Sequence, residues 1–263
     1  MNRRPVLPAL LLGALLAALL PPAAFAADAK KLRIGVEGAY PPFSEVTPSG
    51  QLKGFDIDIA QALCASMQVQ CTLVQQDFDG MIPALQARKF DAIIASMAIT
   101  AERKKQVAFS DKYYNTPARF IVKNGSAITI SAKGLEGKKI GVQRSTIHDR
   151  FVTETFKAAQ IVRYTKQDEV YLDLAAGRID VTLQDTVAAD VGFLKTPQGK
   201  GFTFIGPSYN DVAYFGDGSG IAMRKADTDL LASFNAAIKA IRADGTYKKL
   251  QDKYFDVDVY GWP

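Results

Sequence analysis

One arginine follows a run of small and apolar residues in the segment ASMAITAERKK, residues 95–105. Thr100 suits the N-cap of a helix, which would place Arg103 in the first helical turn. A cation there is disfavoured by the helix dipole by roughly 0.3 to 1 kcal/mol, and a bound anion would reverse that penalty. Because a guanidinium binds a carboxylate through two parallel hydrogen bonds, Arg103 is a candidate carboxylate-binding residue. The alternative is a solvated arginine beside Glu102.

Polar residues also stand at four points where a predicted strand ends: EGAY (37–40), ASMAIT (95–100), QRSTIH (143–148) and QDT (184–186). In open α/β sheets, ligands bind beyond the carboxyl ends of the strands. These corners are therefore the candidate ligand site. The sequence contains no credible metal cluster, nucleophile elbow or phosphate-binding loop, so we expect neither a metal nor a cofactor.

The first 26 residues predict export. They carry two arginines, a short apolar core and a terminal AFA, which is typical of a secretory signal peptide. Removing them would lower the formal net charge from +5 to +3. No later segment approaches the roughly 18 consecutive apolar residues of a transmembrane helix, so we expect a soluble periplasmic protein. Lys and Arg are scattered without a dense run, which argues against nucleic-acid binding.

Two cysteines, Cys64 and Cys71, are the only ones in the chain. In an exported protein they are close enough to close a short loop, and we expect one disulfide. A free or metal-binding pair is the alternative, but no histidine accompanies them.

The elements that must position these residues alternate along the chain. Apolar runs of strand length alternate with segments of helical period, which implies mainly parallel sheets. Strands are predicted at 32–36, 71–75, 91–97, 118–124, 138–143, 161–165 and 179–184, and helices at 54–68, 78–89, 147–156, 169–177, 186–195 and 228–255.

The pattern restarts near residue 119, and this indicates two lobes. We predict an α/β fold with a mainly parallel central sheet in each lobe, flanked by helices. The first lobe would comprise residues 27–115 and 214–263, and the second lobe residues 116–213. The chain would cross between them near 115–117 and 214–218, and these two crossings would form the hinge.

Several segments together resemble the periplasmic solute-binding proteins for polar amino acids, above all the lysine/arginine/ornithine-binding and histidine-binding members. The likeness covers essentially the whole mature chain. It is carried by GFDIDIAQALC, DGMIPALQARKFDAIIASMAITAERKKQVAFSDKYY, LAAGRIDVTLQD and RADGTYKKLQDKYFD. It implies the periplasmic-binding-protein fold and import of an amino acid.

The resemblance also implies roles for individual residues. Arg103 matches the arginine that binds the ligand α-carboxylate, and Asp185 matches the aspartate that accepts the α-ammonium. The alternative for Asp185 is a helix N-cap, and one aspartate can do both. Together these two residues would bind the α-carboxylate and the α-ammonium, the amino-acid head of the ligand. Backbone groups from both lobes would complete this head site: Ser96, Ala98, Thr146 and Ile147.

For the ligand side chain, the resemblance points to an acid and two aromatic rings. Tyr40 and Phe78 stand where related proteins stack aromatic faces on the ligand, which is worth about 1 to 2 kcal/mol when desolvated. Glu37 matches an acid that meets the distal cation. Taken alone, the aromatic residues would more often be core and the carboxylate solvent-exposed.

This chain also departs from the pattern of its relatives. Ala95 and Ala98 replace two serines that would touch the ligand, and Glu37 is one methylene longer than the usual aspartate. The second-lobe loop differs as well, at Gln143, Arg144, Ser145 and Ile147. We count Ala95 and Gln143 among the expected ligand contacts. Arg144 would oppose a cationic ligand if it pointed inward. His148, the only histidine, could contact the ligand or set a pH dependence, or merely begin a helix at the surface.

We therefore predict a monomeric, non-enzymatic binding protein for a basic L-amino acid. Arginine is expected first, with ornithine, lysine and histidine as neighbours. Lobe closure would deliver the ligand to an inner-membrane ABC permease and its ATPase. The alternatives are an opine-binding protein, since the alanines enlarge the pocket, a sensory module, and a periplasmic dehydratase on the same fold.

Overall fold

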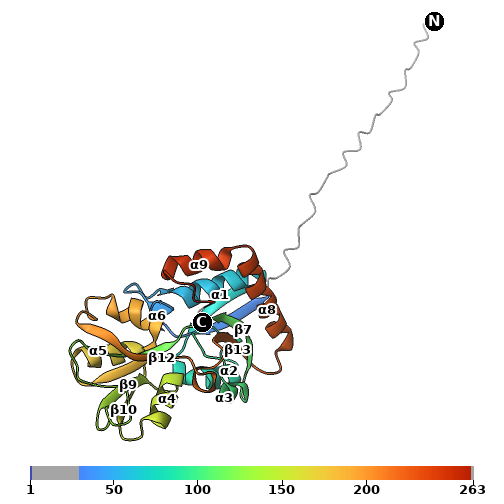
Figure 1. Cartoon of the computed structure of the whole chain (residues 1–263). Coiled ribbons are helices and arrows are strands. Elements are labelled where there is room, and N and C mark those ends of the chain that lie inside the picture. The colour runs from blue at the N-terminus through green and yellow to red at the C-terminus, as the bar shows by residue number, and fades with distance from the viewer. Residues whose placement is uncertain (2–29, 262–263) are drawn as a thin grey trace.

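The computed structural model describes residue 1 and residues 30–261 (Figure 1). Apart from Met1, the predicted signal peptide lies outside the described residues. Within the part of the chain that is described, no helix combines the length and the apolar character that crossing a membrane requires.

Two five-stranded sheets form the centres of two lobes, seen on either side of Figure 1. The first-lobe sheet has the order β5-β1-β6-β13-β7: Gln70–Gln75, Lys31–Val36, Ala92–Ile93, Ser219–Met223 and Ala108–Tyr114. The second-lobe sheet has the order β10-β9-β11-β8-β12: Gln160–Tyr164, Lys139–Gln143, Val181–Asp185, Ala118–Lys123 and Phe202–Tyr209. A small third sheet contains β2 (Ala39–Tyr40), β3 (Ser44–Val46) and β4 (Leu52–Lys53).

Four of the five strands in each large sheet run in the same direction. The exceptions are β13 and β8, each antiparallel to both of its neighbours. Each of these two strands is the first one that the chain forms after it crosses from the other lobe. The predicted fold, two lobes with mainly parallel sheets, is therefore confirmed.

Helices cover both large sheets. Those of the first lobe are α1 (Phe55–Ser66), α2 (Met81–Gln86), α3 (Ala101–Lys104), α8 (Thr228–Ala243), α9 (Thr246–Tyr254) and the 3₁₀ turn η1 (Phe78–Gly80). Those of the second lobe are α4 (Ile147–Thr155), α5 (Gln167–Ala175), α6 (Thr186–Ala189), α7 (Val212–Phe215) and the π-helical turn η2 (Asp190–Leu194).

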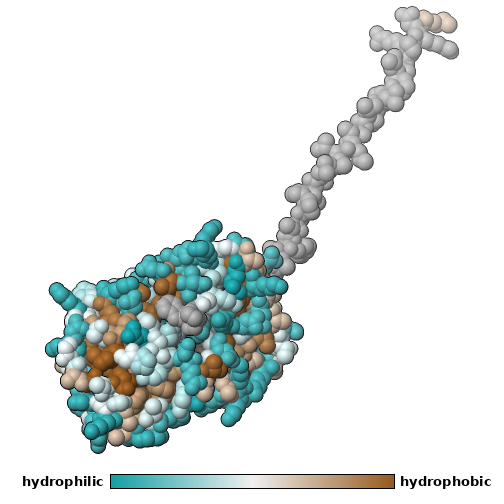
Figure 2. Space-filling model, in the orientation of Figure 1, coloured by the Kyte–Doolittle hydropathy of each residue, from teal (hydrophilic) through white to brown (hydrophobic). Residues whose placement is uncertain are grey.

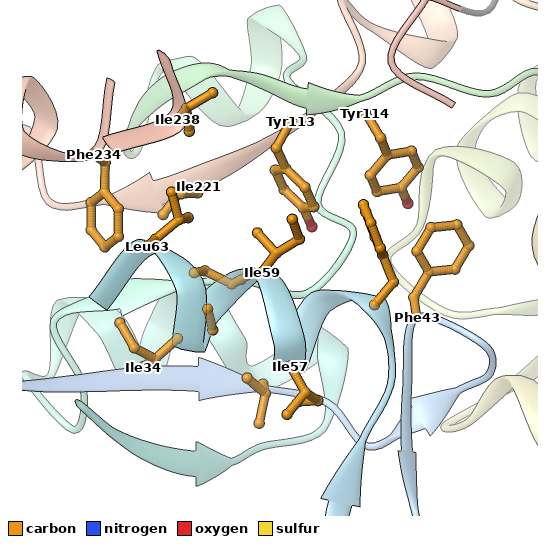
Figure 3. Close-up of a cluster of buried hydrophobic side chains, with 14 of the residues drawn as sticks. Ile34, Phe43, Ile57, Ile59, Leu63, Tyr113, Tyr114, Ile221, Phe234 and Ile238 are labelled. Carbon is orange, nitrogen blue, oxygen red and sulfur yellow. The ribbon is translucent and has the colours of Figure 1, made fainter. Parts of the chain in front are cut away.

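The first-lobe sheet is buried on both faces. Along β6 and the residues after it, Ala92 and Ile94 pack into the apolar cluster beneath α1 and α8, whereas Ile93 and Ala95 pack into the cluster beneath α2. Successive strand side chains point to opposite faces, so a continuous apolar run is what such a strand requires. Figure 3 shows the α1 cluster, with Tyr113 and Tyr114 extending from β7 over the helix.

Hydrophilic residues cover most of the outer face in Figure 2. Among the described residues after Met1, the large apolar side chains that are exposed come from separate elements: Val46 from β3, Leu172 from α5, Val212 from α7 and Val257 from the C-terminal segment.

Three predicted elements are shorter or broken. The strand predicted at 91–97 is only two residues long, because from Ile94 onward the chain leaves the sheet to form the pocket loop. The helix predicted at 228–255 ends at Ala243, and a new one begins after Gly245, whose φ of +81° is a left-handed conformation favoured by glycine. The helix predicted at 186–195 continues after Ala189 as η2.

The chain crosses between the lobes after β7 and again after α7. Tyr214 and Phe215 of α7 pack against the second-lobe core. The domain boundaries given above, and the hinge role of residues 115–117 and 214–218, stay predictions.

The expected disulfide joins Cys64, near the end of α1, to Cys71 in β5. It therefore ties a helix to the neighbouring strand of the first-lobe sheet.

Replacing both Cys64 and Cys71 by serine should lower the free energy of unfolding by about 2 to 3 kcal/mol, because the cross-link restricts the unfolded chain. Denaturant unfolding of the oxidised wild type and the double variant measures this difference. An equal loss on reducing the wild type should follow, and no change in either comparison would contradict the stabilising role.

Candidate functional site

A cavity lies between the two lobes and is lined by residues of both. All eleven residues that the sequence analysis proposed as ligand contacts line it: Glu37, Tyr40, Phe78, Ala95, Ser96, Ala98, Arg103, Gln143, Thr146, Ile147 and Asp185. The structure thus brings the four strand-end corners together. Their contact with a ligand stays a prediction.

Arg103 reaches the cavity from α3. The Thr100 side chain caps this helix, as predicted, by accepting a hydrogen bond from the Arg103 backbone N–H at 3.2 Å. The guanidinium donates to the backbone carbonyl of Ala98 at 3.0 Å and, across the cleft, to that of Ser145 at 3.1 Å. Burial lowers the pKa of Arg103 to about 10, so it remains a cation at neutral pH. Arg103 is therefore half-buried and hydrogen-bonded rather than freely solvated, and its contact with a ligand carboxylate stays a prediction.

Asp185 enters from the opposite lobe, at the end of β11. It is the N-cap of α6, since its Oδ1 accepts from the backbone N–H groups of Val187 and Ala188, both at 2.9 Å. Its Oδ2 accepts from the Thr116 hydroxyl on the first crossing. Burial raises the pKa of Asp185 to about 6. The same carboxylate caps a helix and lines the cavity.

Glu37 lies at the end of β1 and is only 4% exposed, which excludes the alternative of a solvated carboxylate. Its Oε1 accepts a hydrogen bond of 2.5 Å from Nε2 of Gln143 in the second lobe. The same nitrogen donates to the Thr165 carbonyl at 3.0 Å. Burial, with smaller contributions from the nearby acids Asp168 and Asp56, raises the pKa of Glu37 to about 7.

The charged groups that line the cavity do not cancel. With Glu37, Asp185 and Arg103 ionised, the lining carries a net charge of −1. His148 adds none, because burial and the charge of Arg103 lower its pKa to about 3. An occupant with a net charge of +1 would neutralise the cavity.

The aromatic residues serve both the core and the cavity. Tyr40 lines the pocket and stacks on Phe43, with ring centroids 5.7 Å apart. Phe78 lines it as well, and its ring lies 5.4 Å from Cζ of Arg103. The protein's own guanidinium thus contacts Phe78.

The structure settles where two uncertain residues lie. Arg144 is not among the cavity-lining residues; its Nε lies 2.7 Å from Oδ2 of Asp79 in the first lobe, so it forms an ion pair across the cleft rim. His148 does line the cavity and is only 7% exposed, with its ring 6.2 Å from that of Phe215. The prediction of a surface histidine is wrong.

Sequence reasoning missed the part of the lining that the two crossings supply. These residues are Tyr114, Asn115, Thr116, Ala118, Phe215, Gly218 and Ser219. Residues 115–117 and 214–218 are predicted to form a hinge because of their turn residues, but nothing in their local pattern shows that the same segments face the cavity.

The chain matches the model of the bacterial extracellular solute-binding proteins, family 3, over residues 32–257. It is 54% identical over 253 residues to the L-arginine-binding protein of Pseudomonas aeruginosa, covering 95% of this chain and 97% of that one. It is 48% identical over 239 residues to the lysine/arginine/ornithine-binding periplasmic protein of Escherichia coli, covering 90% and 92%.

Solved structures show the same fold. A Salmonella typhimurium periplasmic binding protein, described as having high arginine specificity, is 34% identical with a TM-score of 0.80. The match covers 86% of this chain and 100% of that one.

The ligand-free protein should be less stable near pH 7.5 than near pH 5.5, by at least about 2 kcal/mol. Burial raises the pKa of Glu37 and Asp56 to about 7 and that of Asp168 and Asp185 to about 6. The native state then binds more protons than the unfolded chain, so stability falls as the pH rises through this window. His148, held neutral, contributes in the opposite sense.

Chemical unfolding at a series of pH values measures this slope. The variant Glu37→Gln should show a shallower slope, whereas Glu136→Gln, at an exposed position before β9, should not. A stability that rises steadily from pH 5.5 to 7.5 would contradict the assignment.

Proposed function

Because the chain belongs to the bacterial extracellular solute-binding proteins of family 3, we propose that it captures an amino acid with a cationic side chain, arginine foremost, for delivery to an importer. Ornithine, lysine and histidine are the neighbouring ligands. The proposal extends to a periplasmic location, a monomeric state, and an inner-membrane ABC permease with its ATPase as partners.

The net charge of −1 on the cavity lining is the observation that favours a ligand with a cationic side chain. An amino acid with a cationic side chain has a net charge of +1 and would leave the closed cavity neutral. A neutral amino acid would leave Glu37 buried without a counter-charge, and an acidic one would place like charges together. The relatives named for arginine, lysine and ornithine support the same class.

The amino-acid head would lie between the lobes. Two guanidinium N–H groups of Arg103 donate to the carbonyls of Ala98 and Ser145. The remaining N–H groups can bind the α-carboxylate. Asp185, on the facing lobe, would accept from the α-ammonium. Because one ligand joins an acid and a base on opposite lobes, binding and closure are coupled.

The side chain would extend toward Glu37, between the aromatic groups. The Gln143 amide holds Oε1 of Glu37 and fixes the plane of the carboxylate, which leaves Oε2 for the ligand. A guanidinium is planar, weakly hydrated and suited to such a fixed acceptor, so arginine is preferred over lysine. Closure excludes water and strengthens these charge-assisted hydrogen bonds.

We further propose that the chain has no catalytic role. The pKa of His148, about 3, is too low for general acid–base chemistry near neutral pH. A dehydratase would have to rely on Glu37, whose pKa of about 7 is suitable but which we assign to the ligand cation. Recovery of unchanged ligand after incubation and denaturation supports transport, and turnover of a cyclic amino-acid precursor would refute the proposal.

Calorimetric titration of refolded, ligand-free protein against the common amino acids and octopine tests the ligand class. We expect the tightest binding for arginine, weaker binding for ornithine, lysine and histidine, and the weakest for acidic amino acids. Tightest binding of octopine would favour the opine alternative, and tightest binding of a neutral or acidic amino acid would overturn the proposal.

The variant Arg103→Ala should lose binding of every amino acid by at least about a hundredfold, because the α-carboxylate is common to all of them. Lys104→Ala is the matched control, since this lysine is adjacent in α3 and pairs with Asp217 outside the pocket. Circular dichroism would establish that both variants are folded. Retained affinity in Arg103→Ala contradicts the head-site assignment.

The variant Glu37→Gln should weaken arginine binding by roughly ten- to a hundredfold, because a buried cation loses its counter-charge. Citrulline, the neutral isostere of arginine, should bind to the Glu37→Gln variant as tightly as to the wild type, or more tightly. Titration of both ligands against the wild type and the variant gives the comparison, with Glu45→Gln as the surface control. Equal losses for the two ligands would remove Glu37 from the distal site.

A further inference from the structure

Asp56 is a buried carboxylate that the proposed function leaves unused. It is the second residue of α1, fully buried, and does not line the cavity. Helix α1 begins after Gly54, where a side chain is excluded because a Cβ would lie 2.3 Å from the Phe43 carbonyl oxygen. The first turn of α1 is therefore packed closely against the backbone at Phe43.

Both carboxylate oxygens of Asp56 accept hydrogen bonds from groups that adjoin the pocket. Oδ1 accepts from the Tyr113 hydroxyl at 2.8 Å, and Oδ2 accepts from the Ser96 hydroxyl at 2.9 Å. The Tyr113 oxygen in turn accepts from the Ser96 backbone N–H at 3.0 Å. Asp56, Ser96 and Tyr113 thus form a closed ring of three hydrogen bonds. Figure 3 shows the Tyr113 hydroxyl directed toward α1.

One member of this ring has an unusual backbone conformation. Ser96 has a φ of +52°, a left-handed value that non-glycine residues seldom adopt without a specific restraint. The Ser96 side chain and N–H both form hydrogen bonds within the ring, which leaves the carbonyl as the remaining backbone group for a ligand. Two residues later, the Ala98 carbonyl holds the guanidinium of Arg103.

A carboxylate suits this ring better than a neutral side chain of the same shape. In its ionised form Asp56 can only accept, so Tyr113 must donate to it, and the Tyr113 oxygen is then free to accept from Ser96. An asparagine would direct its NH₂ group at one of these hydroxyls. That hydroxyl would have to reverse its hydrogen bond or leave a proton without an acceptor.

We propose that Asp56 is a positioning residue for the amino-acid head site, which holds the pocket segment at Ser96 in its left-handed conformation through the ring with Tyr113. It acts without touching the ligand. The inference rests on the proposed function, because it concerns the same pocket.

The position of Asp56 is unfavourable for stability alone. Burial raises its pKa to about 7, despite the hydrogen bonds from Tyr113 and Ser96 that lower it. A charge in such a place disfavours the folded state, and groups of this kind concentrate at functional sites. Tyr113 is restrained in turn, since its backbone carbonyl accepts from the Tyr247 hydroxyl at 2.7 Å.

The test compares two variants with two ligands. Asp56→Asn keeps the shape of the side chain and disturbs the hydrogen-bond ring. Tyr113→Phe keeps the packing of the aromatic side chain and removes the hydroxyl that Asp56 and Ser96 share. Each should weaken both arginine and citrulline by about tenfold or more, because both ligands have the same amino-acid head. The double variant should lose little more than either single variant, since one ring is broken in every case.

Asp58→Asn is the matched control. Asp58 lies two residues further along the same helix and accepts from Lys253 at 2.7 Å and Tyr254 at 2.8 Å, away from the pocket. It should change stability without changing affinity. If Asp56→Asn does not fold, Tyr113→Phe decides the question.

Wild-type affinity in the folded Asp56→Asn or Tyr113→Phe variant would overturn the proposal. A loss confined to arginine would overturn it too, because it would mark a charge effect rather than positioning of the head. Failure of the wild type to bind any basic amino acid would instead refute the proposed function, so the two failures are distinguishable.

Discussion

Charged groups that the fold buries among neutral partners are the constraint on which this molecule depends. Glu37 is held by an amide, Asp185 by a hydroxyl and backbone N–H groups, and Arg103 by two backbone carbonyls. Neutral partners satisfy the hydrogen bonds of a charge but do not neutralise it. When these groups are ionised, the cavity therefore retains an electrostatic demand, which protonation of a carboxylate or an occupant of the opposite net charge can meet.

The two-lobe architecture makes that demand specific. Arg103 and Glu37 belong to the first lobe, whereas Asp185 and Gln143 belong to the second. A ligand that engages both sets must hold the lobes together, and the rim ion pair between Arg144 and Asp79 lies on the same closed interface. Burying the charged groups of the cavity costs free energy in the ligand-free protein. Ligand binding offsets this cost, because any ligand that binds only the folded state stabilises it.

Much of the fold was predictable because it follows from local periodicity. Alternating strands and helices, the restart near residue 119 and the loop closed by Cys64 and Cys71 are all visible in the sequence. The errors lie where tertiary contacts override local pattern. The apolar run at 91–97 looks like a full strand, yet beyond Ile93 it serves the pocket, and the long C-terminal amphipathic segment is divided at Gly245.

The candidate site divides in the same way. By itself, the sequence placed polar residues at the strand ends and made Arg103 a candidate for binding a carboxylate, because local pattern predicts both strand ends and helix caps. The roles of Asp185 and Glu37 were predicted from the family resemblance. Tertiary structure alone decided that the crossings line the cavity, that Arg144 faces outward to Asp79, that His148 is buried, and that Asp56 supports Ser96 from beneath. These facts depend on contacts between residues far apart in the chain, and periodicity carries no information about such contacts.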